Sequence, residues 1–564
     1  MKLSENAKQL LNARYLLKNT EGKIVESPEE LFWRVAKYVA SVEKEDRKKW
    51  ENKFYALLAN LHFLPNSPTL MNAGLLNGQL SACFVLPVED SLNSIFTTLK
   101  NTAMIYNFSQ LRPHGDMVSS SGGFSSGPMA FIKIYDTATE HVRQGGKRRG
   151  ANMGILNVDH PDIEAFILAK TKGEALHNFN LSVGITDDFM KTVQQGTDWK
   201  LINPRTKKIT KTIKAKKLWN EIVSQAWATG DPGLIFLDMI NKHNPVAEIG
   251  KIQSTNPCGE VPLFEFESCN LGSVNLSKMV VSKESEGVGV DWNKLEGTIA
   301  LAVRFLDNVI SANHYLLPQI EQETKSNRKI GLGVMGWAEM LAMLNIPYAS
   351  EKAVSLGEKL MQFVQDKSYR ASAELALERG VFPNWERSIF YPNKPMRNAT
   401  CNSIAPTGSI SVIADTSYSI EPLYALAYKR VGILENQTQM ELNPIFVGKM
   451  KALGLWDDKV KNEVLNTGSL QHLEYIPKAV KKVFETSLEI PWEYHLRHQQ
   501  VFQKYTDNAV SKTINLSKST SKKTVSDIYM TAWKYGLKGI TIYRDGSKAN
   551  QVLQACHLNK SPNC

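Results

Sequence analysis

One short segment of the sequence combines side chains that could carry out chemistry on a small substrate. Asn256, Cys258 and Glu260 are spaced two residues apart in the segment Asn-Pro-Cys-Gly-Glu. In an extended or loop segment, side chains at this spacing can point the same way, so an amide, a sulfur and a carboxylate could reach one ligand. A carboxylate beside a substrate can act as a general base. The segment therefore predicts catalysis, with a core cysteine in a Pro-Gly turn as the alternative.

The cysteine inventory narrows this chemistry. The chain of 564 residues has six cysteines: Cys83, Cys258, Cys269, Cys401, Cys556 and Cys564. So few cysteines in so long a chain indicate a protein that folds without disulfides, in which functional cysteines are redox, catalytic or metal-binding. Zinc is disfavoured, because the residues between Cys258 and Cys269 contain neither a CxxC pair nor a histidine.

Two further motifs give weaker signals. Thr407, Gly408 and Ser409 offer backbone N–H groups and hydroxyls that could hold a phosphate, although a simple turn would also explain them. His495 and His498 could bind a metal, but no third ligand lies nearby, and a solvated helix face is the preferred interpretation. We therefore predict no metal site.

A glycine motif resembles a dinucleotide site and is rejected as one. Gly331, Gly333 and Gly336 match the pattern G-x-G-x-x-G. A dinucleotide site requires a preceding apolar strand, whereas residues 323–329 are charged and polar. We interpret these glycines as sites of close helix packing.

Short apolar strands that alternate with helices are expected to position the candidate residues. Apolar patterns predict strands at 83–86, 179–185 and 234–237, and helices at 162–169 and 295–310. Ser27 and Glu30 frame a capping box with proline at the first helical position, which predicts a helix start. The repeated alternation predicts an α/β fold with parallel strands.

The bulk composition is that of a globular protein with a positive charge. Hydrophobic residues make up 43% and charged residues 22% of the chain, and the net charge is +11. No stretch of about 18 apolar residues is present, so we expect no membrane span. The polar segment 1–20 lacks the apolar part of a signal peptide, so we expect a cytoplasmic protein. The basic stretch 207–217 could bind nucleic acid, but it lacks interleaved aromatic residues, and we interpret it as a solvated hairpin leading into a helix.

Taken in chain order, the motifs resemble those of the ribonucleotide reductase catalytic chain over nearly the whole length. The matching stretches are 66–74, 81–84, 111–113, 256–260 with Cys269, 406–410 and 506–516. The resemblance implies a ten-stranded α/β barrel with a central finger loop that carries a radical cysteine. We expect a helical N-terminal region at 1–60, the barrel at 61–544 and a flexible C-terminal tail at 545–564.

The resemblance also implies roles for the matched residues. Cys258 would become a thiyl radical that takes hydrogen from C3′ of the ribose. Glu260 would accept the proton of the 3′-hydroxyl, and Asn256 would hold the ribose hydroxyls. Cys83 and Cys269 would supply the reducing equivalents and close into a disulfide. The residues implied in substrate binding are Ser67, Ala82, Cys83, Arg148, Thr407, Gly408 and Ser409.

The resemblance is strongest to the class II members, which depend on adenosylcobalamin, at 404–414 and 419–428. The class I chain carries a stacked tyrosine pair that receives the radical from a second subunit, whereas the matching segment here has only Tyr543. The glycyl-radical motif of class III is not matched at 543–547. A cofactor must then make the first radical, which implies adenosylcobalamin. A class I-like chain with a separate radical-generating subunit and a non-catalytic nucleotide-binding paralogue are the alternatives.

Regulation is implied by a second group of matched residues. Asp90, Ser91, Leu92 and Arg112 resemble the site for deoxyribonucleotide effectors, which in the family forms across a homodimer. We recognise no ATP-cone domain at the N-terminus, so we expect specificity control without overall control by ATP. The family's glycine-rich run before Asn107 has no counterpart at 100–106.

Re-reduction is assigned to the tail. Each turnover would oxidise Cys83 and Cys269 inside the barrel, and thiol–disulfide exchange requires direct attack of one sulfur on another. We predict that Cys556 and Cys564 form a shuttle that receives electrons from thioredoxin or a similar reductant. The implied substrates are ribonucleotides, with diphosphates favoured.

Overall fold

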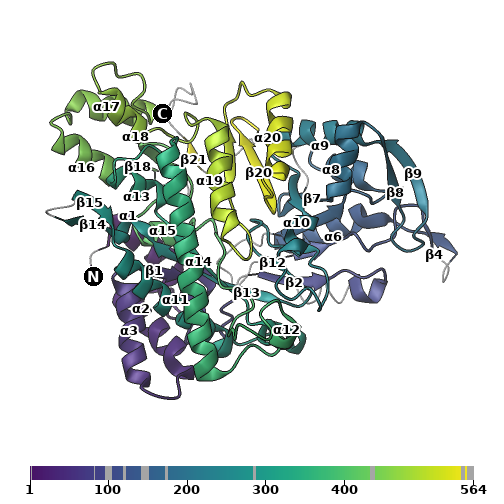
Figure 1. Ribbon diagram of the computed structural model, residues 1–564, viewed down its shortest axis with the longest axis horizontal. Coiled ribbons are helices and arrows are strands. Elements are labelled where there is room, and N and C mark those ends of the chain that lie inside the picture. Colours follow the sequence, from purple (N-terminus) through teal and green to yellow (C-terminus); the bar gives the residue numbers. More distant parts are fainter. Residues whose placement is uncertain are drawn as a thin grey trace.

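The N-terminal part of the protein is helical. The computed structural model describes residues 1, 3–81, 83–95, 105–118, 122–141, 152–171, 176–283, 287–431, 438–547 and 553–554. Helices α1 (Glu5–Leu10), α2 (Pro28–Val39) and α3 (Arg47–Ala59) come first, with α2 and α3 at the lower left of Figure 1. The predicted capping box is present, because Ser27 accepts a hydrogen bond from Glu30 N and donates its own N–H to the Glu30 carboxylate. The helical N-terminal region is confirmed.

A large sheet follows, made of two sets of parallel strands. The first set consists, in spatial order, of β2 (Cys83–Pro87), β3 (Ile105–Asn107), β6 (Asn152–Asn157), β7 (Phe179–Ile185) and β10 (Gly233–Phe236). The second set contains β20 (Gly539–Arg544), β19 (Thr513–Leu516), β16 (Ile330–Met335) and β13 (Ser268–Asn275). The sets run antiparallel to each other where β10 meets β20 and where β2 meets β13.

Residues 402–404 close this sheet into a barrel. Parallel bridges join Leu332 of β16 to Asn402, and Ile404 to Val510 just before β19. Strand β1 (Phe63–Pro65) pairs with β13 in line with β2, so these two form one wall position. With 402–404 counted as a strand, the ring has ten positions, five in each half. The ten-stranded α/β barrel is therefore confirmed.

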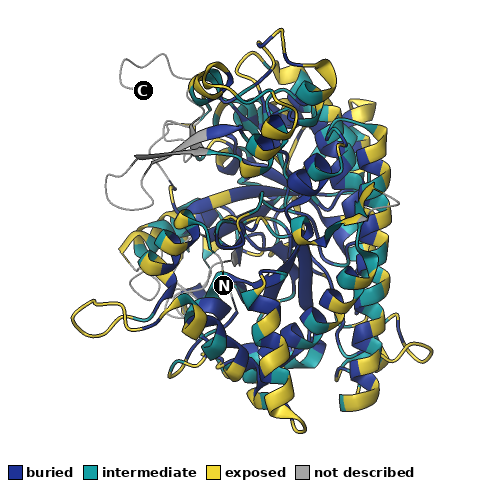
Figure 2. Ribbon diagram, turned by 90° about the vertical axis from the view of Figure 1, so that its left-hand side faces the viewer, coloured by how far each residue is buried: buried dark blue, intermediate teal, exposed yellow. Residues whose placement is uncertain are grey.

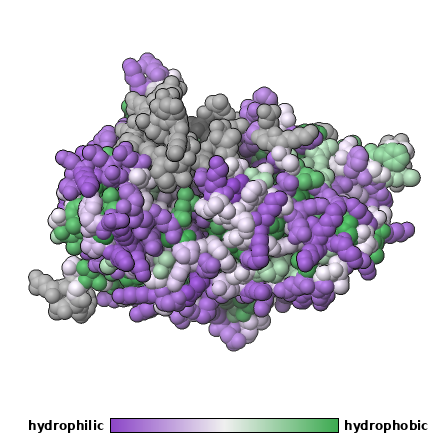
Figure 3. Space-filling model, turned by 90° about the horizontal axis from the view of Figure 1, so that it is seen from above, coloured by the Kyte–Doolittle hydropathy of each residue, from purple (hydrophilic) through white to green (hydrophobic). Residues whose placement is uncertain are grey.

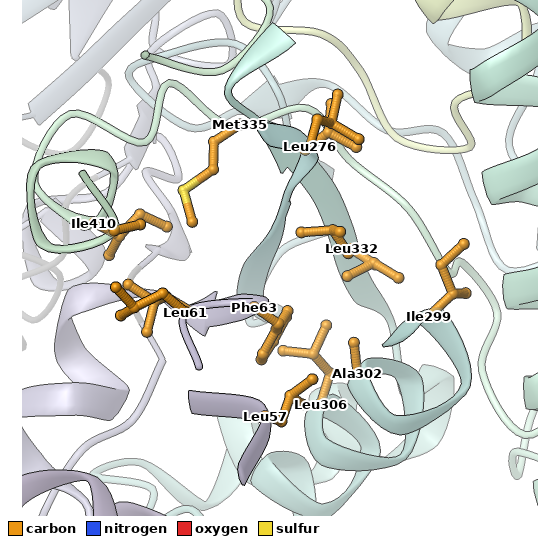
Figure 4. Packing of buried hydrophobic residues seen from close by; sticks show 14 of the residues in the cluster. Leu57, Leu61, Phe63, Leu276, Ile299, Ala302, Leu306, Leu332, Met335 and Ile410 are labelled. Atoms are coloured by element: carbon orange, nitrogen blue, oxygen red, sulfur yellow. The ribbon is translucent and has the colours of Figure 1, made fainter. Parts of the chain in front are cut away.

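Helices cover the barrel on the outside, as Figures 1 and 2 show. Leu332 of β16 and Phe63 of β1 face Leu57 of α3 and Leu306 of α11 (Trp292–Ala312) across a buried cluster (Figure 4). Burying each such side chain contributes about 1.5–3 kcal/mol. Other covering helices include α6 (Gly127–His141), α7 (Ile163–Ile167), α8 (Asp187–Gln195), α9 (Ala215–Thr229), α13 (Trp337–Met343), α14 (Glu351–Arg379), α19 (Trp492–Lys504) and α20 (Lys522–Lys534).

The face of the molecule seen in Figure 3 is mainly polar. Seen from above, hydrophilic side chains cover most of the face, and hydrophobic ones are scattered in small groups (Figure 3). None of the helices in the described residues has an apolar stretch that could cross a bilayer. The basic stretch forms the exposed hairpin of β8 (Asp198–Ile202) and β9 (Ile209–Lys214), which leads into α9. This confirms the predicted hairpin.

Two sequence interpretations were wrong. His495 and His498 are fully buried on α19. The Nε2–H of His495 donates to Ser487 O, and that of His498 donates to Tyr348 O. Helical spacing alone does not tell a buried face from a solvated one. Gly331 and Gly333 lie inside strand β16, not at a helix contact. A Cβ at Gly333 would meet Ser403 O at 2.3 Å, so the glycine permits a close approach of neighbouring strands.

The predicted tail contains a short strand. Residues Leu553–Gln554 form β21, which pairs antiparallel with β17 (Ala427–Val431). Strand β17 also pairs with β18 (Thr438–Leu442), next to a small helical lobe made of α16 (Pro444–Ala452), α17 (Asp458–Thr467) and α18 (Lys478–Val483). The cysteines of the tail, Cys556 and Cys564, lie outside the described residues.

Candidate active site

The candidate catalytic segment is a tight hairpin. Strands β11 (Ser254–Thr255) and β12 (Pro262–Leu263) pair antiparallel, and we call residues 254–263 the finger hairpin. Asn256 Oδ1 accepts a hydrogen bond from Val261 N at 3.0 Å, which closes the turn. Gly259 has a φ of 81°, a conformation that favours glycine, and its N–H donates to Asn256 O at 2.9 Å. The Asn-Pro-Cys-Gly-Glu sequence thus specifies this turn.

The finger hairpin lies inside the barrel. Its Val261 and Leu263 belong to a buried cluster with Cys83 of β2, Met153 of β6 and Ile235 of β10. These wall residues come from the first set of strands. The second half of the barrel contacts the hairpin through polar groups, because Ser403 Oγ donates to Glu260 O at 2.9 Å. The central finger loop implied by the resemblance is therefore confirmed.

The three candidate side chains of the hairpin differ in exposure. Cys258 is exposed at the tip, whereas Glu260 is 3% and Asn256 2% exposed. A Cβ added to Gly259 would meet no atom within 4 Å, so the space beside Cys258 is open. The Cys258 thiol at the tip is thus accessible to a substrate or cofactor, whereas the Glu260 carboxyl is shielded from water.

The environment of Glu260 suits proton transfer at neutral pH. Its Oε2 is buried and accepts no hydrogen bond from the described residues. Burial raises the pKa of Glu260 to about 7, and the hydrogen bond with Asn256 opposes this shift. A carboxyl group with a pKa close to the working pH can both accept and return a proton. Glu260 therefore has the properties of a general base, and its Oε2 is available to accept a proton from a ligand.

Cys83 and Cys269 are brought together by strand pairing. They are Cα partners in the antiparallel register of β2 and β13. Directly opposite Cα atoms in such a pair are about 4.5–5.5 Å apart, within the range of about 4.4–6.8 Å found in disulfides. The side chain of Cys269 lies outside the described part of the chain. The backbone geometry therefore permits a reversible disulfide here.

Comparisons with known proteins decide the family. The family model described as "Ribonucleotide reductase, barrel domain" matches residues 81–392 and 391–543, and "Ribonucleotide reductase, all-alpha domain" matches 1–78. The chain belongs to the ribonucleotide reductase family. It is 46% identical to the vitamin B12-dependent ribonucleoside-diphosphate reductase of Thermoplasma acidophilum, over 98% of this chain and 80% of the relative. A protein of the same name from Mycobacterium tuberculosis is also 46% identical, over 98% of this chain and 81% of the relative.

A solved structure supports the same assignment. The class Id ribonucleotide reductase alpha subunit of Actinobacillus ureae superposes with a TM-score of 0.79 at 26% identity. The match covers 96% of this chain and 97% of that chain. The structural match and the family models therefore agree over most of this chain.

The predicted substrate residues of this reductase lie in two described segments. Ser67 begins α4 (Ser67–Asn72), and its hydroxyl is 2.7 Å from Tyr15 OH. Thr407 is buried, and its hydroxyl accepts a hydrogen bond from Ser419 N at 2.8 Å, so this side chain holds the loop in place. Gly408 is exposed with open space around it, and Ser409 precedes α15 (Ile410–Ile413). Ala82 and Arg148 lie outside the described residues.

The predicted effector residues of the reductase come together. Arg112 Nε is 2.8 Å from an oxygen of Asp90, although the two are 22 positions apart. Ser91 Oγ accepts a hydrogen bond from Ser94 N, and Leu92 is 66% exposed. The structure thus places Arg112 against the segment 90–92 through its ion pair with Asp90.

Sequence reasoning missed the wall residues that contact the finger hairpin. Asn180 of β7 donates to Pro257 O at 3.1 Å, and Ser403 Oγ donates to Glu260 O at 2.9 Å. Residues 179–185 alternate apolar side chains with Asn180, Ser182 and Gly184, so no local signal singles out Asn180. No group of three or more metal-ligating side chains gathers within the described ranges.

Proposed function

We propose that the chain reduces ribonucleotides to 2′-deoxyribonucleotides through a thiyl radical on Cys258, with adenosylcobalamin as the source of that radical. The observation that carries the proposal is the finger hairpin, with Cys258 exposed at its tip and Glu260 buried two residues later inside the barrel. The relatives at 46% identity are named as vitamin B12-dependent reductases.

The residues of the chain account for each change in the substrate. Cys258 would give the hydrogen atom of its S–H bond to the radical that the bound cofactor supplies. The sulfur radical left on Cys258 takes hydrogen from C3′ of the ribose. Glu260 Oε2 receives the proton of the 3′-hydroxyl. The 2′-hydroxyl leaves as water with a proton from one of the Cys83 and Cys269 thiols, and C2′ gains the hydrogen of the other. The two thiols thereby supply two electrons and close into a disulfide. Cys258 then returns hydrogen to C3′, and Glu260 returns its proton.

Cys258 is accessible to a bound cofactor. The thiol is exposed and the space beside Gly259 is open, so Cys258 and Gly259 would face the adenosyl group. When bound, adenosylcobalamin supplies a carbon-centred radical that a thiol cannot generate alone.

The remaining roles follow the resemblance. We assign the substrate's phosphates, as diphosphates, to the exposed backbone around Gly408, and deoxyribonucleotide effectors to the Asp90–Arg112 site of a cytoplasmic homodimer. Substrate contacts are completed by Ser67, Ala82, Cys83, Arg148, Thr407 and Ser409.

The tail cysteines are assigned to re-reduction. Cys556 and Cys564 would exchange with the Cys83–Cys269 disulfide and receive electrons from thioredoxin. A Cys556→Ser/Cys564→Ser variant should lose turnover supported by thioredoxin and keep turnover supported by dithiothreitol, which diffuses into the site.

The test is turnover by the purified full chain on CDP, ADP, GDP and UDP, with dithiothreitol and with or without adenosylcobalamin. Deoxyribonucleotides should form only with the cofactor. Cys258→Ser should abolish turnover while nucleotide binding remains, because an O–H bond is too strong to relay the hydrogen. Cys401→Ala is the control, since this buried cysteine lies in a separate cluster. Product formation by Cys258→Ser would contradict the radical assignment.

The class Id structural match favours one second candidate. In this alternative the chain receives its radical from a separate subunit. Wild-type protein that is inactive with adenosylcobalamin, and active only after addition of a radical-generating partner, would support it.

A further inference from the structure

The internal hydrogen bonds of the finger hairpin shape its turn but do not fix where the tip lies in the barrel. The hairpin's ladder consists of the pairs Ser254↔Leu263 and Thr255↔Pro262. A two-stranded hairpin is marginally stable by itself. The height of Cys258 in the barrel must therefore be set by contacts with the walls.

The wall contacts come from both halves of the barrel. From the second half, Ser403 Oγ and Ala509 N donate to Glu260 O at 2.9 and 2.8 Å. From the first half, Asn180 Nδ2 donates to Pro257 O at 3.1 Å. The carbonyl that Asn180 holds belongs to the peptide bond that leads into Cys258. The Cys258 and Glu260 ends of the tip are thus held from opposite sides.

The side chain of Asn180 points into the barrel, where it reaches Pro257 O. Its neighbours Phe179 and Leu181 are buried in the outer cluster between sheet and helices. Because strand side chains alternate between faces, Asn180 faces the interior. There it lies opposite Met153, which belongs to the interior cluster with the finger hairpin. Within β7, Asn180 is the one exposed position.

We propose that Asn180 is a positioning residue that fixes the Cys258 thiol relative to Glu260, with Ser403 as its counterpart on the opposite wall. The inference rests on the proposed function, because it gives the thiol its radical role. Asn180 acts on the backbone of the tip and touches no reacting atom. A misplacement of about 1 Å can cost about 100-fold in rate, so one hydrogen bond that fixes the tip is expected to matter for turnover.

The test compares Asn180→Asp with Asn107→Asp in the full chain. Both changes keep the size of the side chain and remove its N–H donor. Asn107 Nδ2 donates to Gln253 O at 2.7 Å, at the foot of the hairpin, and its Oδ1 accepts from Ser109 N, a contact that aspartate retains. Asn180→Gln keeps an amide and serves as the rescue, and Asn180→Ser removes the amide without adding charge.

The first readout needs no cofactor. Amide hydrogen exchange of residues 254–263 should accelerate by about fivefold in Asn180→Asp and Asn180→Ser, as expected for loss of one neutral hydrogen bond. Asn107→Asp should leave the exchange of the tip unchanged, and Asn180→Gln should recover protection. Unchanged exchange in both Asn180→Asp and Asn180→Ser overturns the inference.

The second readout is turnover with adenosylcobalamin and dithiothreitol. The kcat of Asn180→Asp should fall about 10–100-fold, with the KM for nucleotide within about threefold of wild type. An increase in the KM for nucleotide or for cofactor, with kcat unchanged, overturns the inference, because Asn180 would then contact that ligand. An inactive wild-type chain would count against the proposed function alone, and hydrogen exchange would still decide whether Asn180 holds the tip.

Discussion

Cys83 of β2 and Cys269 of β13 occupy opposite positions at the seam where the two halves of the barrel meet. Their Cα pairing is one of two register pairs between these strands, the other joining Phe84 to Ser268. A slip by one residue would turn one of the cysteines to the other face of the sheet. The proposed redox pair therefore depends on closure of the barrel, because each half contributes one of the two cysteines.

We predict that turnover without reductant joins Cys83 to Cys269. Protein reduced beforehand and freed of dithiol should form at most about one product per active site, since re-reduction requires a further thiol. Peptide mapping should then find the Cys83–Cys269 disulfide. Cys401 is the internal control, because burial raises the pKa of its thiol and keeps it unreactive. A disulfide that includes Cys258 would contradict the assignment.

We predict that turnover falls on the acid side of neutrality because Glu260 becomes protonated. Burial raises the pKa of Glu260 to about 7, and only the carboxylate can accept the 3′-hydroxyl proton. The kcat should therefore decline as pH drops below about 7, with one ionisation on the acid limb. Glu260→Gln should reduce kcat by about 10²–10⁴-fold and remove that limb. An unchanged acid limb in the variant would assign the ionisation to another group.

The sequence predicted the site better than the walls around it. The finger hairpin is local, so the Asn-Pro-Cys-Gly-Glu segment predicts both its turn and its chemistry. Strand β7 matches the predicted range 179–185, because its apolar pattern is local as well. Residues 402–404, which close the barrel, are defined by partners about 70 and 106 positions away, at Leu332 and Val510. Long-range pairing of this kind leaves no local pattern, and the interior role of Asn180 has the same origin.

We predict that Asp90→Asn weakens specificity control. The Asp90 carboxylate holds Arg112 through Nε, and Arg112 also donates to Met117 O at 3.1 Å. Loss of this pair should release the guanidinium and shrink the changes that dTTP, dGTP and dATP cause in relative substrate rates. Asp116→Asn is the matched control, because Asp116 forms a similar pair with Arg205 outside the predicted effector site. Equal effects of the two variants would mean that the Asp90 pair is structural.

We predict that Glu43 joins the N-terminal helices to the barrel domain and that Glu43→Gln destabilises the protein. The Glu43 carboxylate accepts hydrogen bonds from Arg304 and Asn308 of α11 and from Arg379 of α14. Removing the charge of one partner in a buried ion pair lowers the free energy of unfolding by about 3–5 kcal/mol. The midpoint of thermal unfolding should therefore shift clearly to lower temperature. Glu378→Gln is the matched control. Both carboxylates bond Arg304, but the Glu43 side chain is 2% and the Glu378 side chain 49% exposed.

The exposed Glu378 pair is screened by water and should contribute less than about 1 kcal/mol. The effect of Glu43 should also depend on pH. Burial alone would raise the pKa of Glu43. The hydrogen bonds from Arg304, Asn308 and Arg379 outweigh this effect, so the pKa lies below its usual value of 4.5. A depressed folded-state pKa stabilises the fold above the unfolded pKa and loses that effect as pH falls through the folded value. The gap between wild type and Glu43→Gln should therefore be constant near neutrality and narrow below about pH 4.5. Equal losses of stability in Glu43→Gln and Glu378→Gln would mean that burial does not determine how strongly these ion pairs stabilise the protein.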